Sequence, residues 1–181
     1  MVLKVKGEKT TLEEVVPADA ADICALRNDE KISRFLSSSR QVSVEEQRQW
    51  IENNLAKGDG HYFRILDEKG GFCGTASLYN VLDNEAEFGR FICTRTLQAV
   101  ETEYLVIRHA FETMGLRRIY CRTAVENKKV WKMHYSYGFV DAGEEAFSVP
   151  GKDMVLRIQE LTLEQYGQTD YSFISKLMAK F

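Results

Sequence analysis

The sequence has few prolines, no paired cysteines, no long apolar run and little net charge. Only Pro17 and Pro150 occur, and no serine- or glycine-rich linker divides the 181 residues. No apolar run approaches the roughly 18 residues of a membrane span, and the N-terminus lacks the apolar segment of a signal peptide. These absences predict one cytoplasmic domain without a membrane partner.

The charge and the cysteines argue against further classes of protein. A net charge of -3 argues against a nucleic-acid partner, which favours a basic face. The four cysteines are far apart, and no two of them form a CxxC pair. Disulfide frameworks and zinc sites need clustered ligands, so we expect reduced core cysteines and no metal site. The cysteines are Cys24, Cys73, Cys93 and Cys121.

Apolar periodicity and turn residues predict the element order β, αα, βββ, α, β, α, ββ. Ser43 and Glu46 have the spacing of a capping box, so a helix should begin there. Asp83-Asn84 and Pro150-Gly151 mark turns between strands. The alternation indicates a mixed α/β domain around one sheet. The predicted strands are 11–16, 61–66, 74–81, 85–93, 118–125, 139–147 and 154–161, and the main helices are 17–28, 44–57, 99–114 and 127–137.

The segment from Gly115 to Phe139 reads GLRRIYCRTAVENKKVWKMHYSYGF. It resembles the acetyl-CoA half of the GNAT acetyltransferases, in which a strand, an Asn-led helix and a Gly-Phe follow one another. The predicted element order is also the GNAT order, and the resemblance covers residues 10 to 160. It implies an α/β GNAT fold: a mostly antiparallel central sheet, splayed between strands 4 and 5 and flanked by helices. The domain would span 1–161, with a C-terminal helical extension at 162–181.

The resemblance implies acetyl-CoA as co-substrate, although the phosphate-binding loop is unusual. The family pattern (Q/R)-x-x-G-x-(G/A) falls on TRTLQAVE, which begins at Thr94. One register puts Leu97 and Ala99 on the glycine positions, and the other puts Gln98 and Val100 there. Neither register restores a glycine, which predicts either weaker CoA binding or a lost cofactor site. In both registers Arg95 can contact a phosphate.

The resemblance places the pantetheine arm along the strand that ends at Cys93. Open backbone groups of this strand would pair with the pantetheine amides as an added strand does. Asn127 matches a family residue that contacts CoA, and it is equally well placed as a plain helix N-cap. The candidate cofactor residues are therefore Phe91, Ile92, Cys93, Arg95, Gln98, Ala99, Val100 and Asn127.

Two residues are catalytic candidates through the resemblance. His134 lies seven residues after Asn127, where the family has a Tyr or His that protonates the departing sulfur; a structural helix histidine is the alternative. Glu87, in the segment EAEFG, matches a carboxylate that acts as base; an exposed strand residue is its alternative. The amine would attack the thioester directly, so no cysteine nucleophile is needed.

A second resemblance concerns the acceptor. LRNDEK, which begins at Leu26, and SVEEQRQWI, which begins at Ser43, are similar to segments of amino-sugar-nucleotide acetyltransferases. Less sharply, they are similar to ribosomal-protein N-terminal and polyamine acetyltransferases. The acceptor is therefore expected to be a small-molecule amine, and a GNAT-fold binding protein without catalysis is the alternative. The candidate acceptor residues are Arg27, Asn28 and Glu85. The amphipathic tail either docks on the domain or mediates a homodimer.

Overall fold

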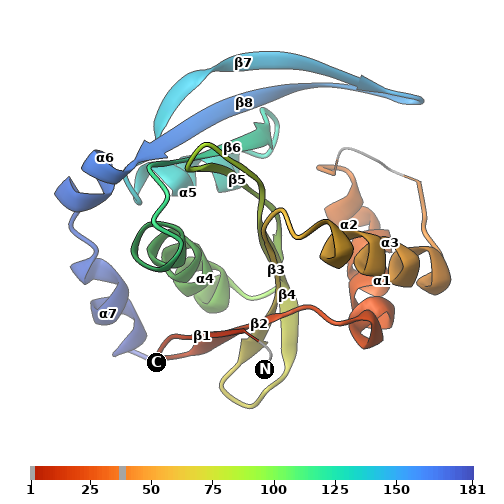
Figure 1. The fold of residues 1–181 in the computed structure, drawn as a ribbon, viewed down its shortest axis with the longest axis horizontal. Coiled ribbons are helices and arrows are strands. Elements are labelled where there is room, and N and C mark those ends of the chain that lie inside the picture. Colours follow the sequence, from red (N-terminus) through yellow and green to blue (C-terminus); the bar gives the residue numbers. More distant parts are fainter. Residues whose placement is uncertain (1–2, 37–39) are drawn as a thin grey trace.

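One eight-stranded sheet is the centre of the computed structural model, which describes residues 3–36 and 40–181. The strand order is β1-β2-β3-β4-β5-β6-β8-β7, and each neighbouring pair is antiparallel except β5 with β6. Helices cover both faces (Figure 1), which confirms the mixed α/β fold. The strands are β1 Lys4–Lys6, β2 Thr10–Glu14, β3 His61–Asp67, β4 Phe72–Leu82, β5 Glu85–Cys93, β6 Arg118–Ala124, β7 Val140–Val149 and β8 Lys152–Thr162.

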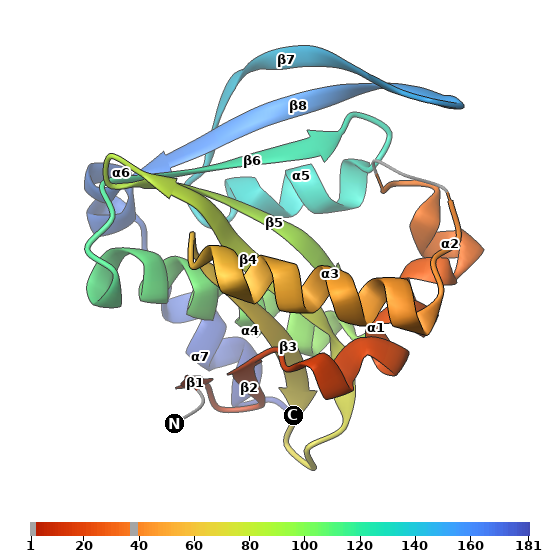
Figure 2. The ribbon, with the colours of Figure 1, turned by 45° about the vertical axis from the view of Figure 1, so that its right-hand side comes forward.

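The helices fall into two groups on opposite faces of the sheet. Figure 1 shows α1, α2 and α3 on one side, with α4, α5 and α7 on the other. Figure 2 shows the same layers with α3 in front of the strands and α4 behind them. The bounds are α1 Ala20–Asn28, α2 Glu30–Ser33, α3 Val44–Lys57, α4 Thr96–Arg108, α5 Lys128–Tyr135, α6 Leu163–Gln168 and α7 Ser172–Met178.

Local chemistry explains where α3 begins and ends. The Ser43 hydroxyl accepts from the Glu46 amide at 3.2 Å, and the Glu46 carboxylate accepts from the Ser43 amide at 2.7 Å. This reciprocal pair is the predicted capping box. Gly58 follows the last turn with a φ of 63°, a conformation that suits glycine.

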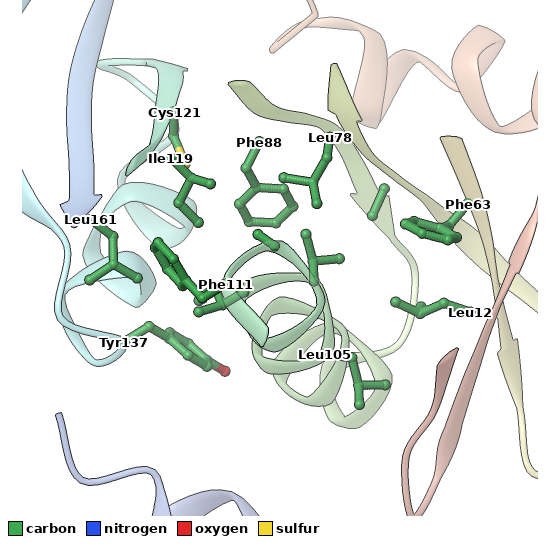
Figure 3. Packing of buried hydrophobic residues seen from close by; sticks show 14 of the residues in the cluster. Leu12, Phe63, Leu78, Phe88, Leu105, Phe111, Ile119, Cys121, Tyr137 and Leu161 are labelled. Carbon is green, nitrogen blue, oxygen red and sulfur yellow. The ribbon is translucent and has the colours of Figure 1, made fainter. Parts of the chain in front are cut away.

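The main core surrounds α4, which lies across the sheet (Figure 3). Leu105 and Val106 on α4 are buried against sheet residues such as Phe88 and Ile119. Sheet residues with side chains on this face alternate with residues facing α1 and α3, as the period of a strand requires. A second, smaller cluster lies under α1 and α3 and includes Ile23 and Ile51.

Two segments differ from the sequence prediction. Strand β1 was not predicted; it pairs with β2 at the sheet edge. The helix predicted over 99–114 starts at Thr96 and continues after Arg108 as a π-helical turn, His109–Thr113. Gly115 follows with a φ of 68°, in the predicted role of helix stop.

The C-terminal tail docks on the domain. Strand β8 extends to Thr162, and the tail then forms α6 and α7 instead of one helix. Ile174 and Met178 are buried in the main core, and the Tyr171 hydroxyl donates to the Tyr137 carbonyl at 2.9 Å. Phe181 remains 76% exposed. No helix among the described residues is both long and apolar enough to cross a membrane.

His109 is a buried histidine at the start of the π-helical turn. Its ring packs edge-on against Phe63 and His61, with centroids 5.7 and 5.2 Å away. Its Nε2 is buried and makes no hydrogen bond to any described residue. Burial, together with the smaller effect of the neighbouring His61, lowers the pKa of His109 from 6.5 to about 4.

We therefore expect His109 to make the protein acid-sensitive. Because folding lowers this pKa, the unfolded chain binds a proton at higher pH than the folded protein does. The contribution of His109 to stability is therefore complete above pH 6.5 and is lost as the pH falls toward 4. The shift corresponds to up to about 3 kcal/mol. His109→Leu should flatten the free energy of unfolding across this range, measured by urea titration at several pH values. An unchanged slope would contradict this assignment.

Candidate active site

Strands β5 and β6 pair only at their start and then separate. Their parallel register joins Glu85, Ala86 and Glu87 to Arg118, Ile119 and Tyr120. Beyond this point β5 remains paired with β4, and β6 remains paired with β8 (Figure 2). The predicted splay is therefore present. Backbone groups of β5 from Phe88 onward lack a β6 partner, which leaves an edge that can pair with an extended amide chain.

The N-terminus of α4 follows β5 directly and carries no side-chain cap. Arg95 occupies the N-cap position without a capping hydrogen bond, and the helix's first backbone bond runs from the Ala99 amide to the Arg95 carbonyl at 2.9 Å. The amides of Thr96, Leu97 and Gln98 precede that bond, so none has a carbonyl four residues earlier within the helix. Such amides, together with the helix dipole, bind phosphate groups.

Side-chain direction compensates for the missing glycines in this loop. Leu97 and Val100 pack against the main core, and Gln98 is 6% exposed with its Nε2 3.4 Å from the Lys9 carbonyl. Because these side chains turn inward, the first turn presents backbone on its outer side without needing glycine there. The residues present therefore fit a pyrophosphate.

Arg95 is already engaged by an acid. Its guanidinium pairs with Asp67, whose carboxylate also accepts from the amides of Gly71 and Lys69 at 2.7 and 2.9 Å. These bonds, with that of Gly71 strongest, lower the pKa of Asp67. The Arg95 side chain is 54% exposed. Its role in phosphate binding stays a prediction, in which Arg95 contacts the phosphate while it remains paired with Asp67.

Asn127 and Cys93 flank the splay. Asn127 stands at the N-cap position of α5, but its side chain makes no capping hydrogen bond and is free for a ligand. The Cys93 thiol donates to the Arg95 carbonyl at 3.3 Å, and burial raises its pKa to about 11. A thiol that stays protonated at neutral pH is a poor nucleophile. Phe91, Ile92 and Ala99 are half-buried nearby in the chain, and their contacts with CoA remain predictions.

His134 lies under the point where the strands separate. The residue is 2% exposed, and its Nδ1 is 2.6 Å from Glu103 Oε1 on α4. Its ring lies edge-on to Phe88, with centroids 6.1 Å apart. Phe88 is the first β5 residue beyond the last β6 pair. The structure thus brings His134 to the apex of the splay.

Glu87 lies on the face of β5 opposite to Phe88 and the main core, because successive strand residues point to opposite faces. It is 2% exposed. Its carboxylate accepts from Arg122 Nε and Nη2 at 3.0 and 2.9 Å, and from Asn80 Nδ2 at 3.3 Å. The side chain of Tyr79 also hydrogen-bonds this carboxylate. Burial, then the Glu87 charge, raises the pKa of nearby Tyr79.

Glu85 and Arg118 extend this arrangement along the same face. Arg118 donates to Glu85 at 2.9 and 2.7 Å and to Glu160 at 2.8 Å. Arg122 likewise reaches Glu145 at 3.2 Å. Two Glu-Arg-Glu bridges therefore cross the beginning of the splay. Their members Arg118, Arg122 and Glu145 line a cavity of about 350 Å³, together with Tyr120 and Ile158.

The two predicted acceptor residues on α1 have different environments. Asn28 holds the backbone of Val42, with hydrogen bonds of 2.8 and 3.0 Å. Arg27 Nη1 lies 3.4 Å from Gln47 Oε1 on α3 and makes no salt bridge to a described residue. The contacts of Asn28 are those of a structural residue, whereas Arg27 remains free to bind an anion. Their roles toward an acceptor stay predictions.

Arg90 lies beside α3 as well, and the sequence pattern did not reveal it. A bulge in β5 pairs Thr75 with Ile92 but Ser77 with Gly89, and gives Arg90 a φ of 49°. The guanidinium consequently stacks over Tyr79, Trp50 and Tyr62, at 4.0, 4.8 and 6.0 Å from the ring centroids. Strict alternation would have turned Arg90 toward the main core instead.

Glu103 was also missed, although its position carries a signal. It precedes Val106 and Ala110 by three and seven residues, so it lies on the apolar face of α4. A carboxylate on such a face indicates a buried partner. No group of three or more His, Cys, Asp or Glu residues able to hold a metal occurs within residues 3–36 and 40–181.

A splayed sheet with an uncapped helix N-terminus beside the splay defines an acyl-CoA-dependent acetyltransferase fold. The family model described as an acetyltransferase (GNAT) domain matches residues 9–140. The chain therefore belongs to the GNAT family, and it is an N-acetyltransferase that uses acetyl-CoA. A search of curated protein sequences found no match.

Solved structures share this fold over nearly their whole lengths. Spermidine N-acetyltransferase from Vibrio cholerae, in complex with CoA and spermine, has a TM-score of 0.78 at 21% identity, covering 88% of this chain and 99% of that one. FdhC, a nucleotide-linked sugar GNAT, has a TM-score of 0.73 at 25% identity, covering 93% and 94%. A GCN5-related N-acetyltransferase from Brucella melitensis has a TM-score of 0.77 at 16% identity, covering 98% of this chain and 84% of that one.

We expect Asn127→Ala to weaken acetyl-CoA binding about three- to tenfold, the worth of one hydrogen bond. The melting temperature should hardly change, because the Asn127 side chain makes no capping bond. Calorimetric titration and thermal unfolding measure the two effects. Ser43→Ala is the matched control: it removes a real cap and should lower stability by about 1 kcal/mol without changing affinity. A destabilised Asn127→Ala with unchanged affinity would show that Asn127 is only a cap.

Proposed function

We propose that this enzyme acetylates a primary amine on a small molecule that also carries a phosphate or carboxylate group. The amine attacks the thioester directly, without an acyl-enzyme. An amino-sugar nucleotide has both groups and is our leading candidate.

The position of two arginines beside α3 is the observation that carries this proposal. Arg27 and Arg90 are half-buried, and neither makes a salt bridge to a described residue. Both approach one face of α3, where Arg27 reaches Gln47 and Arg90 stacks on Trp50, three residues later. Positions three apart are neighbours on a helix surface. Two partly desolvated cations on one face favour an anionic ligand.

The carboxylates on the face of the sheet that carries Glu87 also favour an anionic acceptor. Glu85, Glu87, Glu145 and Glu160 are all paired with Arg118 or Arg122. A polyamine carries several positive charges and needs unpaired carboxylates to bind. Each of these acids already pairs with an arginine, so the several cationic groups of a polyamine would have to compete with Arg118 and Arg122. The charge balance therefore favours the nucleotide-linked amine over spermidine.

Residues on both faces of β5 would serve the reaction. Acetyl-CoA supplies the activated acetyl group, and the open edge of β5, the first amides of α4 and Asn127 would hold it. Glu87 takes a proton from the amine, directly or through a water molecule. His134 protonates the departing sulfur from the opposite side of the strand. Cys93 takes no part, because its thiol stays protonated.

A panel of amines tests the acceptor class. With acetyl-CoA present, kcat/KM should be about 10- to 100-fold higher for a nucleotide-linked amino sugar than for spermidine, since charge-assisted hydrogen bonds contribute about 1.5–3 kcal/mol each. Release of the free CoA thiol measures turnover. A preference for spermidine would overturn the proposed acceptor class.

Arg90→Gln tests whether Arg90 binds the anionic group of the acceptor. We expect KM for the anionic acceptor to rise about 10- to 100-fold, with KM for acetyl-CoA unchanged. Arg108→Gln is the control, because Arg108 is also half-buried but lies on α4 and contacts the Lys6 carbonyl. The loss should disappear with an acceptor amine that lacks the anionic group. An equal loss with both acceptors would show that Arg90 supports the local structure without binding an anion.

A further inference from the structure

A buried acid-histidine pair lies under the apex of the splay. Glu103 on α4 has no exposed side-chain surface, and its Oε1 is 2.6 Å from Nδ1 of His134 on α5. The imidazole packs against Phe88 and Phe139, with centroids 6.1 and 5.1 Å away. Its Nε2 makes no hydrogen bond to a described residue, and it is not among the fully buried unpaired polar atoms. One ring nitrogen is therefore fixed, and the other is available.

Packing alone does not account for Glu103. A buried carboxylate loses hydration worth several kcal/mol, and apolar residues of similar volume are often equally stable in such positions. Glu101, on the same helix, accepts from the amides of Glu8 and Lys9 at 2.5 and 2.8 Å, and so anchors a loop. The second oxygen of Glu103 has no partner among the described residues. The effect of this carboxylate therefore falls on the His134 ring.

We propose that Glu103 is a positioning residue that holds Nδ1–H of His134 and directs Nε2 toward the reacting sulfur. This inference rests on the proposed role of His134 as the acid. A carboxylate accepts hydrogen bonds, so it holds a ring hydrogen on Nδ1 and leaves Nε2 facing away from Glu103. Neither phenylalanine beside the ring can do this.

The proton transfer balances with these groups. As the carbon–sulfur bond breaks, its electron pair leaves with sulfur, and the proton on Nε2 passes to that sulfur. The former N–H bonding pair stays on Nε2, and the neutral imidazole keeps its Nδ1–H bond to Glu103. The proton that the amine loses then restores the imidazolium through solvent.

Kinetics of two matched variants test the proposal. Glu103→Gln keeps the size and an acceptor oxygen but removes the charge; kcat should fall about 10- to 100-fold, part of the usual contribution of a general acid. KM for acetyl-CoA and for the acceptor should stay within about twofold. Glu101→Gln removes a buried carboxylate from the same helix without touching His134, and should lower the melting temperature but not kcat. Equal losses of kcat in both variants would overturn the proposal.

Nitrogen NMR of the ¹⁵N-labelled wild-type protein gives a test that needs no variant to fold. At alkaline pH the neutral His134 ring should be the Nδ1–H tautomer. The Nε2–H tautomer would mean that Glu103 carries the proton, and would overturn the proposal. His134→Ala with unchanged kcat would instead reject the proposed acid, while the tautomer still reports on Glu103. The two failures are therefore distinguishable.

Discussion

The short parallel pairing of β5 and β6 is the constraint on which the rest of the site depends. Three residue pairs hold the strands together from Glu85 to Glu87, and beyond them each strand keeps only its antiparallel partner. Full pairing would leave no open backbone for an extended ligand. Phe88, at the point of separation, packs against the main core and the His134 ring. The core therefore supports the strand where its pairing ends.

The same strand separates two chemical environments. Toward α4 lie apolar side chains and the His134-Glu103 pair, which is closed to water apart from a small part of the imidazole. Toward α1 and α3 lie charged groups, and the acids there are paired with arginines. A β-bulge adds Arg90 to this second face. In the proposed mechanism, this strand separates the acid, His134, from the face that binds the acceptor.

Local patterns predicted much of this structure. The capping box at Ser43, the stop at Gly115 and the antiparallel meander depend on neighbouring residues and are confirmed. Partners distant in sequence were not predictable. No local pattern indicates that Arg122 binds Glu87 across the splay. Nor does one indicate that the bulge turns the Arg90 side chain away from the main core to the other face of the sheet. The inward turn of Leu97 and Gln98, which replaces the usual glycines, also follows only from tertiary packing.

Hydrogen-deuterium exchange with and without acetyl-CoA tests the central claim that the splay and the α4 N-terminus form the cofactor site. The account predicts slower exchange at 96–98 at the start of α4 and at those amides of 88–93 on β5 that point away from β4, because bound phosphate and pantetheine groups accept from them. Amides of α3 and of the β7-β8 hairpin should exchange unchanged. No protection of these two segments at millimolar acetyl-CoA, or protection elsewhere alone, would contradict the account.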